Sequence, residues 1–236
     1  LSGEKPEVYH AIYEHYLPTA AGGALPSGHP GAILSIADKL DTIVGCFGVG
    51  LTPTGTADPY ALRRQTLGII NIILEKRYLL SLSRLMEKSL ELLAGKVERN
   101  PAEIQADVLE FFRGRVQNLL VARGLSTDAV EAALSSGFDD MLDLEERAEA
   151  LHELKKEPDF EPLAIAFKRV VNISKSHSPG PISPERFENP VEDRLFHAYQ
   201  TIGQKAQKMI SQKDYPSALK ELTQLRKPVD EFFDGV

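Results

Sequence analysis

Cysteine and long apolar runs are almost missing from this sequence of 236 residues. The single cysteine, Cys46, excludes a disulfide framework and fits a reducing compartment such as the cytoplasm. No run of 18 apolar residues occurs, which argues against a membrane-spanning helix. Because the chain begins at Leu1 instead of Met and has no signal-peptide pattern, we expect a cytoplasmic fragment of a longer protein.

An excess of positive charge is also missing. The chain has 27 Lys and Arg against 34 Asp and Glu, which gives a formal net charge of −7. A generic binder of polyanions such as DNA would carry the opposite balance. If RNA binds this chain, it must therefore bind to local basic faces on an acidic body.

Helical periodicity is present along the whole chain. Apolar residues recur every three or four positions, and no stretch alternates as a half-buried strand would. Two loops rich in proline interrupt the pattern, at 18–30 and 176–190. The sequence predicts an all-α fold in two helical domains. We expect helices at 4–17, 32–47, 59–76, 78–94, 102–123, 128–135, 138–154, 162–175, 191–211 and 215–225, with another beginning near 229.

The stretch from Ala37 to Arg64, ADKLDTIVGCFGVGLTPTGTADPYALRR, is the most distinctive part of the sequence. Asp58 and Pro59 predict the start of a helix, because an aspartate caps free N–H groups and proline suits the first helical position. The preceding loop is dense in glycine and is expected to hold one shape. It has no Gly-Lys-Ser/Thr, and the aspartate after it would repel a phosphate, so we do not expect a nucleotide site.

Three segments resemble one family. ADKLDTIVG followed by FGVGLTPTGTADPYALRR is similar to a signature of the β subunit of bacterial glycyl-tRNA synthetase. The segments DVLEFFRGRVQNLLVARGLSTDAV and LAIAFKRVVNI resemble the helical anticodon-binding domain of the same subunit. Together these matches run from about residue 14 to residue 236.

The resemblance implies an HD-like helical bundle at 1–98, truncated at its N-terminus, and an anticodon-binding, DALR-like bundle at 99–236. It implies a catalytically silent part of a cytoplasmic, heterotetrameric glycine–tRNA ligase. The partners would be tRNA(Gly) and a separate α subunit, with no DNA and no membrane. ATP with Mg would serve the whole enzyme through a glycyl-adenylate made on the α subunit, and no cofactor is expected in this fragment.

Asp38 and Asp41 lie one helical turn apart in a helix that resembles the last metal-ligand helix of HD phosphohydrolases. The chain has no His-Asp dipeptide, and one carboxylate from one helix cannot hold a divalent cation against water. We therefore favour a structural role in which Lys39 or a nearby arginine is the partner. Residues before Leu1 could still supply further ligands.

Arg63 and Arg64 lie near a helix start, where a cation gains nothing from the helix dipole. An acidic partner such as Asp38 or Asp41, or an RNA phosphate, would explain them equally well. A second set consists of Arg113, Arg115 and Arg123. The resemblance places their helix near the anticodon stem.

The strongest RNA candidate is the helix at 162–175. Lys168, Asn172 and Lys175 fall at i, i+4 and i+7 on one outward face, with Arg169 alongside, whereas Leu163, Phe167, Val170 and Val171 are expected to be buried. Cations and an amide on one face suit phosphate and base contacts. A solvated helix face is the alternative, and the resemblance favours tRNA contact.

Two other functions stay open. An HD-type metal-dependent phosphohydrolase would need a cation bound through Asp38. A non-catalytic scaffold that bridges subunits would bind another subunit without binding tRNA.

Overall fold

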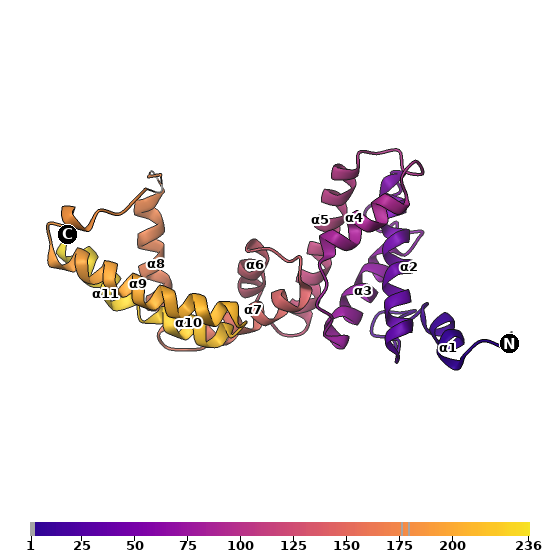
Figure 1. Ribbon diagram of the computed structural model, residues 1–236, viewed down its shortest axis with the longest axis horizontal. Coiled ribbons are helices and arrows are strands. Elements are labelled where there is room, and N and C mark those ends of the chain that lie inside the picture. The colour runs from indigo at the N-terminus through magenta and orange to yellow at the C-terminus, as the bar shows by residue number, and fades with distance from the viewer. Residues whose placement is uncertain (1–2, 176, 179) are drawn as a thin grey trace. The chain divides into compact units, whose positions relative to one another are not determined.

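The computed structural model describes residues 3–175, 177–178 and 180–236, and within them every long regular element is a helix (Figure 1). Two isolated bridges, Thr54 with Ala57 and Ser81 with Asp140, are the only β pairings in these residues. The predicted all-α fold is therefore confirmed. The helices are α1 (Pro6–Glu14), α2 (His29–Gly48), α3 (Leu62–Lys76), α4 (Leu82–Leu92), α5 (Pro101–Ala122), α6 (Thr127–Ser135), α7 (Met141–Leu154), α8 (Phe160–Ser174), η1 (Pro184–Arg186, a 3-10 turn), α9 (Pro190–Ser211), α10 (Tyr215–Thr223) and α11 (Arg226–Gly235).

Side-chain caps and prolines fix several of the helix starts. Asn100 accepts a hydrogen bond from the N–H of Ala102 at 2.9 Å, and a proline follows it as the first residue of α5. Asn189 and Glu192 form a reciprocal capping box at the start of α9. The predicted loop at 176–190 is irregular in its described residues apart from η1 and its last residue, Pro190, which begins α9. Residues 176 and 179 lie outside the described residues.

The chain divides into two compact units, residues 1–145 and 146–236. Helix α5 belongs to the first unit because it packs against α2, α3 and α4. The connection before α5 is also held there, since the N–H groups of Glu98 and Arg99 both donate to the carbonyl of Gly48. The predicted boundary between two domains at 98/99 stays a prediction.

The core of the first unit is formed by α2, α3 and α5, which pack against one another. Helix α3 is apolar on several sides, and Ile69, Ile70 and Ile72 are all inaccessible to solvent. Gly48 allows α2 to approach the next segment closely, because a Cβ at this position would lie 2.3 Å from a methyl group of Val97. Most of the apolar stripe of α2 is buried, at Ile36, Leu40, Ile43 and Phe47.

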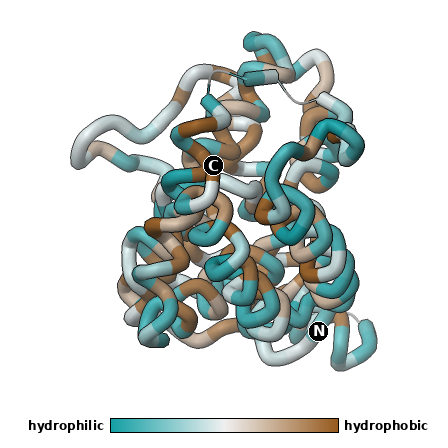
Figure 2. Tube along the Cα trace, turned by 90° about the vertical axis from the view of Figure 1, so that its left-hand side faces the viewer, coloured by the Kyte–Doolittle hydropathy of each residue, from teal (hydrophilic) through white to brown (hydrophobic). Residues whose placement is uncertain are grey.

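Three apolar side chains are exposed, and for Val170 and Val171 the predicted burial is wrong. Ile33, which continues the apolar stripe of α2, is 61% exposed. In the second unit, α8 packs against α11, and α9 packs against α10 and α11. Hydrophobic and hydrophilic stretches alternate along these coils (Figure 2). Leu163 is buried on α8, but Val170 and Val171 are exposed, because the described helices cover only one side of this helix.

Candidate nucleic-acid interface

Asp58 fixes the start of α3 from outside the helix. Its two carboxylate oxygens accept hydrogen bonds from the N–H groups of Leu62 at 2.8 Å and Arg63 at 3.0 Å. The predicted capping carboxylate is thus confirmed, but the predicted helix start at Pro59 is wrong. The reason is Ala61, whose φ of 53° is left-handed and separates Pro59 from the helix.

Replacing Asp58 by alanine is expected to lower the free energy of unfolding by about 0.5–2 kcal/mol, because two N–H groups lose their acceptor. Thermal unfolding followed by circular dichroism measures this change. Asp41→Ala is the matched control, since it removes an exposed carboxylate that forms no ion pair among the described residues. An equal loss in both variants would contradict the capping role.

The glycine loop before α3 is a tight turn with a defined shape. Thr54 and Ala57 exchange backbone hydrogen bonds of 3.1 and 2.8 Å. Gly55 between them has a φ of 50°, a conformation that glycine adopts without strain. The carbonyl of Gly55 then accepts a hydrogen bond from Nη2 of Arg63 at 2.8 Å. The loop therefore sets the direction of this arginine.

Arg115, on α5, lies close enough to Arg63 for the two charges to interact. Its guanidinium covers the Phe111 ring at 3.6 Å from the centroid, and its Nη1 donates to the Phe111 carbonyl at 3.0 Å. Burial lowers the pKa of Arg115 first, and the positive charge of Arg63 lowers it further, while Asp58 opposes the shift. We refer to Arg63 and Arg115 as the arginine pair.

No carboxylate forms an ion pair with either member of the arginine pair within the ranges that the structure describes. The expected acidic partners of Arg63 and Arg64, Asp38 and Asp41, do not bind them there. Two guanidiniums that are fixed by backbone carbonyls and lack a bound carboxylate can bind a phosphate or stack on a base. The arginine pair thus unites predicted site residues from two helices, α3 and α5.

The other arginines of the predicted set are not part of this pair. Arg64 is exposed and Arg113 is half-buried. Arg123 forms an ion pair with Glu145 at 2.6 Å and donates to Asn71 at 3.1 Å. Because it joins α5 to α7 and α3 through these contacts, Arg123 acts as a structural link.

Helix α8 presents three of its four predicted residues to solvent. Lys168, Asn172 and Lys175 are exposed, and Nζ of Lys175 donates to the side-chain oxygen of Asn172 at 3.0 Å. Two cations and an amide thus share one face of this helix.

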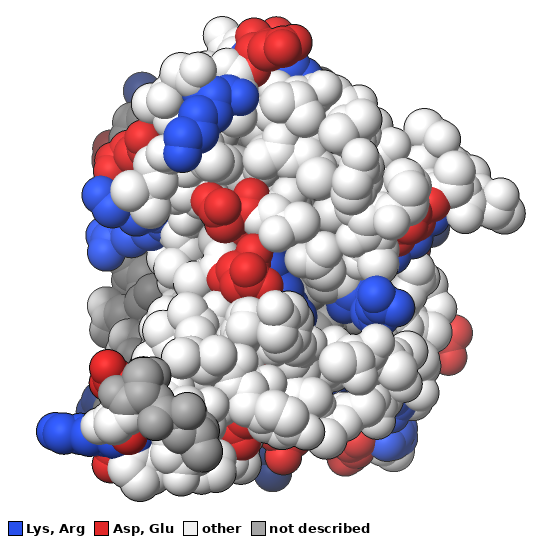
Figure 3. Space-filling view, turned by 90° about the vertical axis from the view of Figure 1, so that its right-hand side faces the viewer, with Lys and Arg blue, Asp and Glu red and all other residues white. Residues whose placement is uncertain are grey.

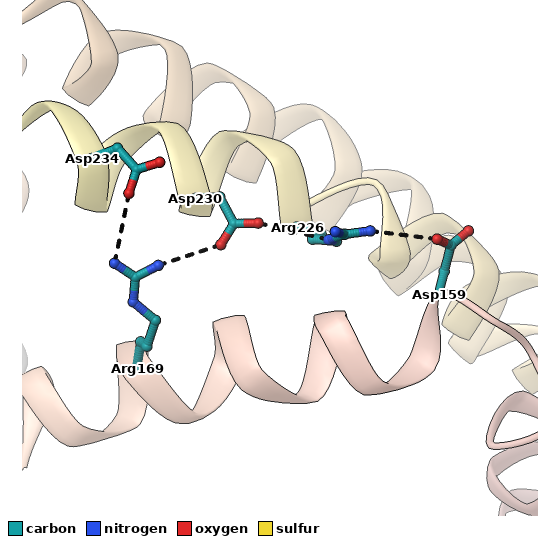
Figure 4. Close-up of polar contacts among 5 residues, drawn as sticks. All are labelled: Asp159, Arg169, Arg226, Asp230 and Asp234. Atoms are coloured by element: carbon teal, nitrogen blue, oxygen red, sulfur yellow. Dashed lines mark hydrogen bonds and ion pairs between the residues drawn. The ribbon is translucent and has the colours of Figure 1, made fainter.

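Arg169 does not lie alongside that face, because it points toward α11 (Figure 4). It lies 3.5 Å from Asp230 and 4.0 Å from Asp234, and its guanidinium lies over the Phe233 ring at 4.2 Å. Arg226 continues the network from Asp230 to Asp159. Arg169 therefore fastens α8 to α11.

Asp38 and Asp41 are exposed, and Lys39 between them is buried. The ammonium of Lys39 donates to the carbonyl of His15 at 2.9 Å and to the hydroxyl of Ser35 at 2.8 Å. Lys39 forms no ion pair with these aspartates among the described residues, because it lies on the buried side of α2. The charge of Asp38 still acts on it and opposes the lowering of its pKa by burial. In the part of the chain that the structure describes, no group of three or more His, Cys, Asp or Glu side chains is placed to hold a metal ion.

Sequence reasoning missed the burial of Lys39, although a signal was present. Ser35, Lys39 and Ile43 lie at i, i+4 and i+8, so the lysine falls on the apolar stripe of α2. Within the described residues, no helix has the length and apolar character that crossing a bilayer requires.

Comparison with known proteins identifies the family. A family model described as glycyl-tRNA synthetase beta subunit matches residues 1–135, which places the chain among components of aminoacyl-tRNA synthetases. The chain belongs to the glycyl-tRNA synthetase beta subunit family.

Curated relatives match the full length of the chain. Each of them is named glycine–tRNA ligase beta subunit. The chain is 50% identical to the protein of Syntrophus aciditrophicus, 54% to that of Geobacter sulfurreducens and 53% to that of Geobacter metallireducens, over 236 residues in each case. These residues are all of the chain and 34% of each relative, so the chain spans about a third of the length of the relatives it matches.

Proposed function

We propose that this chain is the tRNA-binding part of a glycine–tRNA ligase β subunit, in which it holds tRNA(Gly) for ATP-dependent attachment of glycine in the cytoplasm. Adenylate formation, with its ATP and Mg, belongs to a separate α subunit in this proposal. The observation that supports tRNA binding most directly is the arginine pair. Its two cations come from helices distant in sequence and are not neutralised by an ion pair in the described residues.

The surrounding charge makes local contacts necessary. On the face shown in Figure 3, lysine and arginine side chains are scattered among acidic and uncharged ones. The chain as a whole carries a charge of −7. Long-range attraction therefore cannot hold an RNA, and affinity must come from a few close contacts. Arginine suits such contacts because its planar fork matches phosphate oxygens and stacks on bases.

The exposed face of α8 is the second contact in this proposal. Lys168 and Lys175 lie on it without a carboxylate partner in the described residues, and Asn172 can bond to a base edge. Arg169 is excluded from the contact set because Asp230 and Asp234 occupy it. The proposal therefore separates two neighbouring cations of one helix by function.

Lys168→Ala is expected to weaken tRNA binding and to lower the slope of log K against log salt by about one phosphate. Arg169→Ala is expected to leave that slope unchanged and to lower the melting temperature, because α8 loses its contacts with α11. Fluorescence anisotropy with labelled tRNA and circular dichroism measure the two effects. If Arg169→Ala flattens the slope and Lys168→Ala does not, α8 contacts RNA in another way.

The function itself is tested by binding the chain to tRNA(Gly), to a tRNA of another specificity and to a DNA duplex over a range of salt concentrations. We expect tRNA(Gly) to bind most tightly, since the acidic body disfavours any contact that is only electrostatic. Equal affinity for the three nucleic acids, or no binding at low salt, would refute the proposal. The HD phosphohydrolase is not proposed, because Asp38 and Asp41 have no third ligand among the described residues.

A further inference from the structure

An apolar groove of about 650 Å³ lies in the first unit between α2, α4 and the segment that connects α3 to α4. We call it the α2–α4 groove. Three large side chains along it are mostly exposed: Ile33 at 61%, Leu79 at 70% and Leu92 at 66%. Single exposed apolar residues are common on protein surfaces. Several of them along one groove indicate a binding surface. Its main lining residues are Ile33, Ile36, Leu79, Leu85, Ser89 and Leu92.

The groove has a negative edge. Asp38 and Asp41, one turn apart on α2, line it, are exposed and form no ion pair in the described residues. The cation beside them, Lys88, is already paired with Glu91 at 2.7 Å. The charge that the groove offers to an incoming molecule is therefore negative.

Ser89 gives a second, independent indication of a ligand. It lines the same groove, is 7% exposed, and its hydroxyl has no hydrogen-bond partner among the described residues. A buried hydroxyl without a partner is unfavourable, because it has lost its hydrogen bonds to water. Because a hydroxyl can donate or accept, a molecule in the groove that presents a polar group, such as a lysine ammonium, would relieve this cost.

We propose that the α2–α4 groove binds an amphipathic helix of a partner protein, with apolar anchors at helical spacing and Lys or Arg one turn apart along its edge. The apolar lining would take the anchors, and Asp38 and Asp41 would pair with the cations. Nucleic acid and anionic lipid do not fit, because their phosphates would meet these carboxylates. A small polar ligand does not fit either, since Ser89 is the one buried polar side chain in the lining.

This inference does not rest on tRNA binding. The groove lies on α2 and α4, whereas the arginine pair lies on α3 and α5. Helix-in-groove recognition of this kind is read from anchors at i, i+3 or i+4, and i+7. The two carboxylates at i and i+3 on α2 set the spacing of the cations that the partner helix must carry.

Two synthetic helices of roughly five turns test the proposal. They share the same leucines at helical spacing, and one carries lysine where the other carries glutamate along the edge. Binding to the chain is followed by fluorescence anisotropy. We expect the lysine helix to bind at least about tenfold tighter than the glutamate helix. The double variant Asp38→Asn with Asp41→Asn should lose most of that difference, roughly threefold for each carboxylate.

Leu92→Glu should prevent binding of the lysine helix, and the fold should survive because the side chain is 66% exposed. Ile165→Glu on α8, which is 57% exposed and outside the groove, should leave binding unchanged. Equal affinity for the two helices, or no binding of either, overturns the proposal. Self-association in sedimentation that Leu92→Glu abolishes would assign the groove to a second copy of the chain and also overturn it.

Discussion

Replacing Arg63 and Arg115 together by glutamine is expected to weaken tRNA binding by a factor of roughly 30 or more, at about 1–2 kcal/mol for each arginine. The slope of log K against log salt should become shallower by about two phosphates. The physical reason is that both guanidiniums are oriented by backbone carbonyls before any ligand arrives. Little side-chain entropy is then lost on binding, so their removal costs more than the loss of a mobile lysine.

The measurement is the affinity for tRNA(Gly) by fluorescence anisotropy at several salt concentrations. Glutamine retains donors for the carbonyls of Gly55 and Phe111, so the local fold should persist. The double variant Lys88→Gln with Lys156→Gln is the matched control. It removes the same net charge from two exposed residues that already form ion pairs, with Glu91 and Glu153. If the control reduces binding as much as the arginine pair does, the loss reflects net charge alone.

The arginine pair shows what the sequence can predict about this site and where the prediction stops. Arg63 is an RNA candidate because of its place near a helix start, and Arg115 belongs to a second set that the family resemblance places near the anticodon stem. Their proximity depends on the packing of α3 against α5 and on the turn at Gly55. Helical periodicity indicates which side of a helix is buried, but it does not indicate which other helix packs against that side.

Arg169 illustrates the same limit in the opposite direction. On α8 alone it reads as a cation available to RNA. Its partners Asp230 and Asp234 lie on α11, a helix that the sequence indicated only as the start of an element near residue 229. A carboxylate from a distant segment can neutralise a surface cation by forming an ion pair with it, and the local sequence around the cation does not indicate this. Helix positions were therefore predictable from periodicity, whereas charge neutralisation was not.

The ADKLD segment shows a third case. Its two aspartates, one turn apart, resemble metal ligands of HD phosphohydrolases, although helical spacing already places Lys39 on the apolar stripe of α2. In the fold they are exposed, and the buried polar group is Lys39. Its ammonium donates hydrogen bonds to the carbonyl of His15 and to the hydroxyl of Ser35. That hydroxyl in turn donates to the carbonyl of Leu17. Lys39 thus ties the end of α1 and the loop after it to α2.

Lys39→Met is accordingly expected to lower the free energy of unfolding by about 1.5–3 kcal/mol, the range for hydrogen bonds made by charged groups. Methionine keeps most of the packing of the lysine stem but leaves the His15 carbonyl without its donor. Urea unfolding of the full chain, followed by circular dichroism, measures the loss. Lys88→Met is the control, because that lysine is mostly exposed and its pair with Glu91 is a surface pair.

The same lysine also predicts a pH dependence. Burial lowers the pKa of Lys39 below its ordinary value, and Asp38 opposes the shift. Between the lowered pKa of the folded state and the ordinary pKa of the unfolded state, the unfolded chain binds more protons. The contribution of Lys39 to the free energy of unfolding therefore increases as the pH rises through this window. Below the pKa of the folded state this increase is absent. The difference in the free energy of unfolding between wild type and Lys39→Met should therefore increase with pH on the alkaline side.

Asp38→Asn separates this explanation from general alkaline effects. Removing the Asp38 charge takes away the interaction that raises the pKa of Lys39, so the alkaline gain should begin at a lower pH. The variant should otherwise unfold like wild type at neutral pH, because Asp38 is exposed and its side chain holds no ion pair in the described residues. Parallel curves for wild type and Lys39→Met across the alkaline range would mean that Lys39 keeps an ordinary pKa despite its burial. The stability that it gives the ADKLD helix would then come from its hydrogen bonds alone.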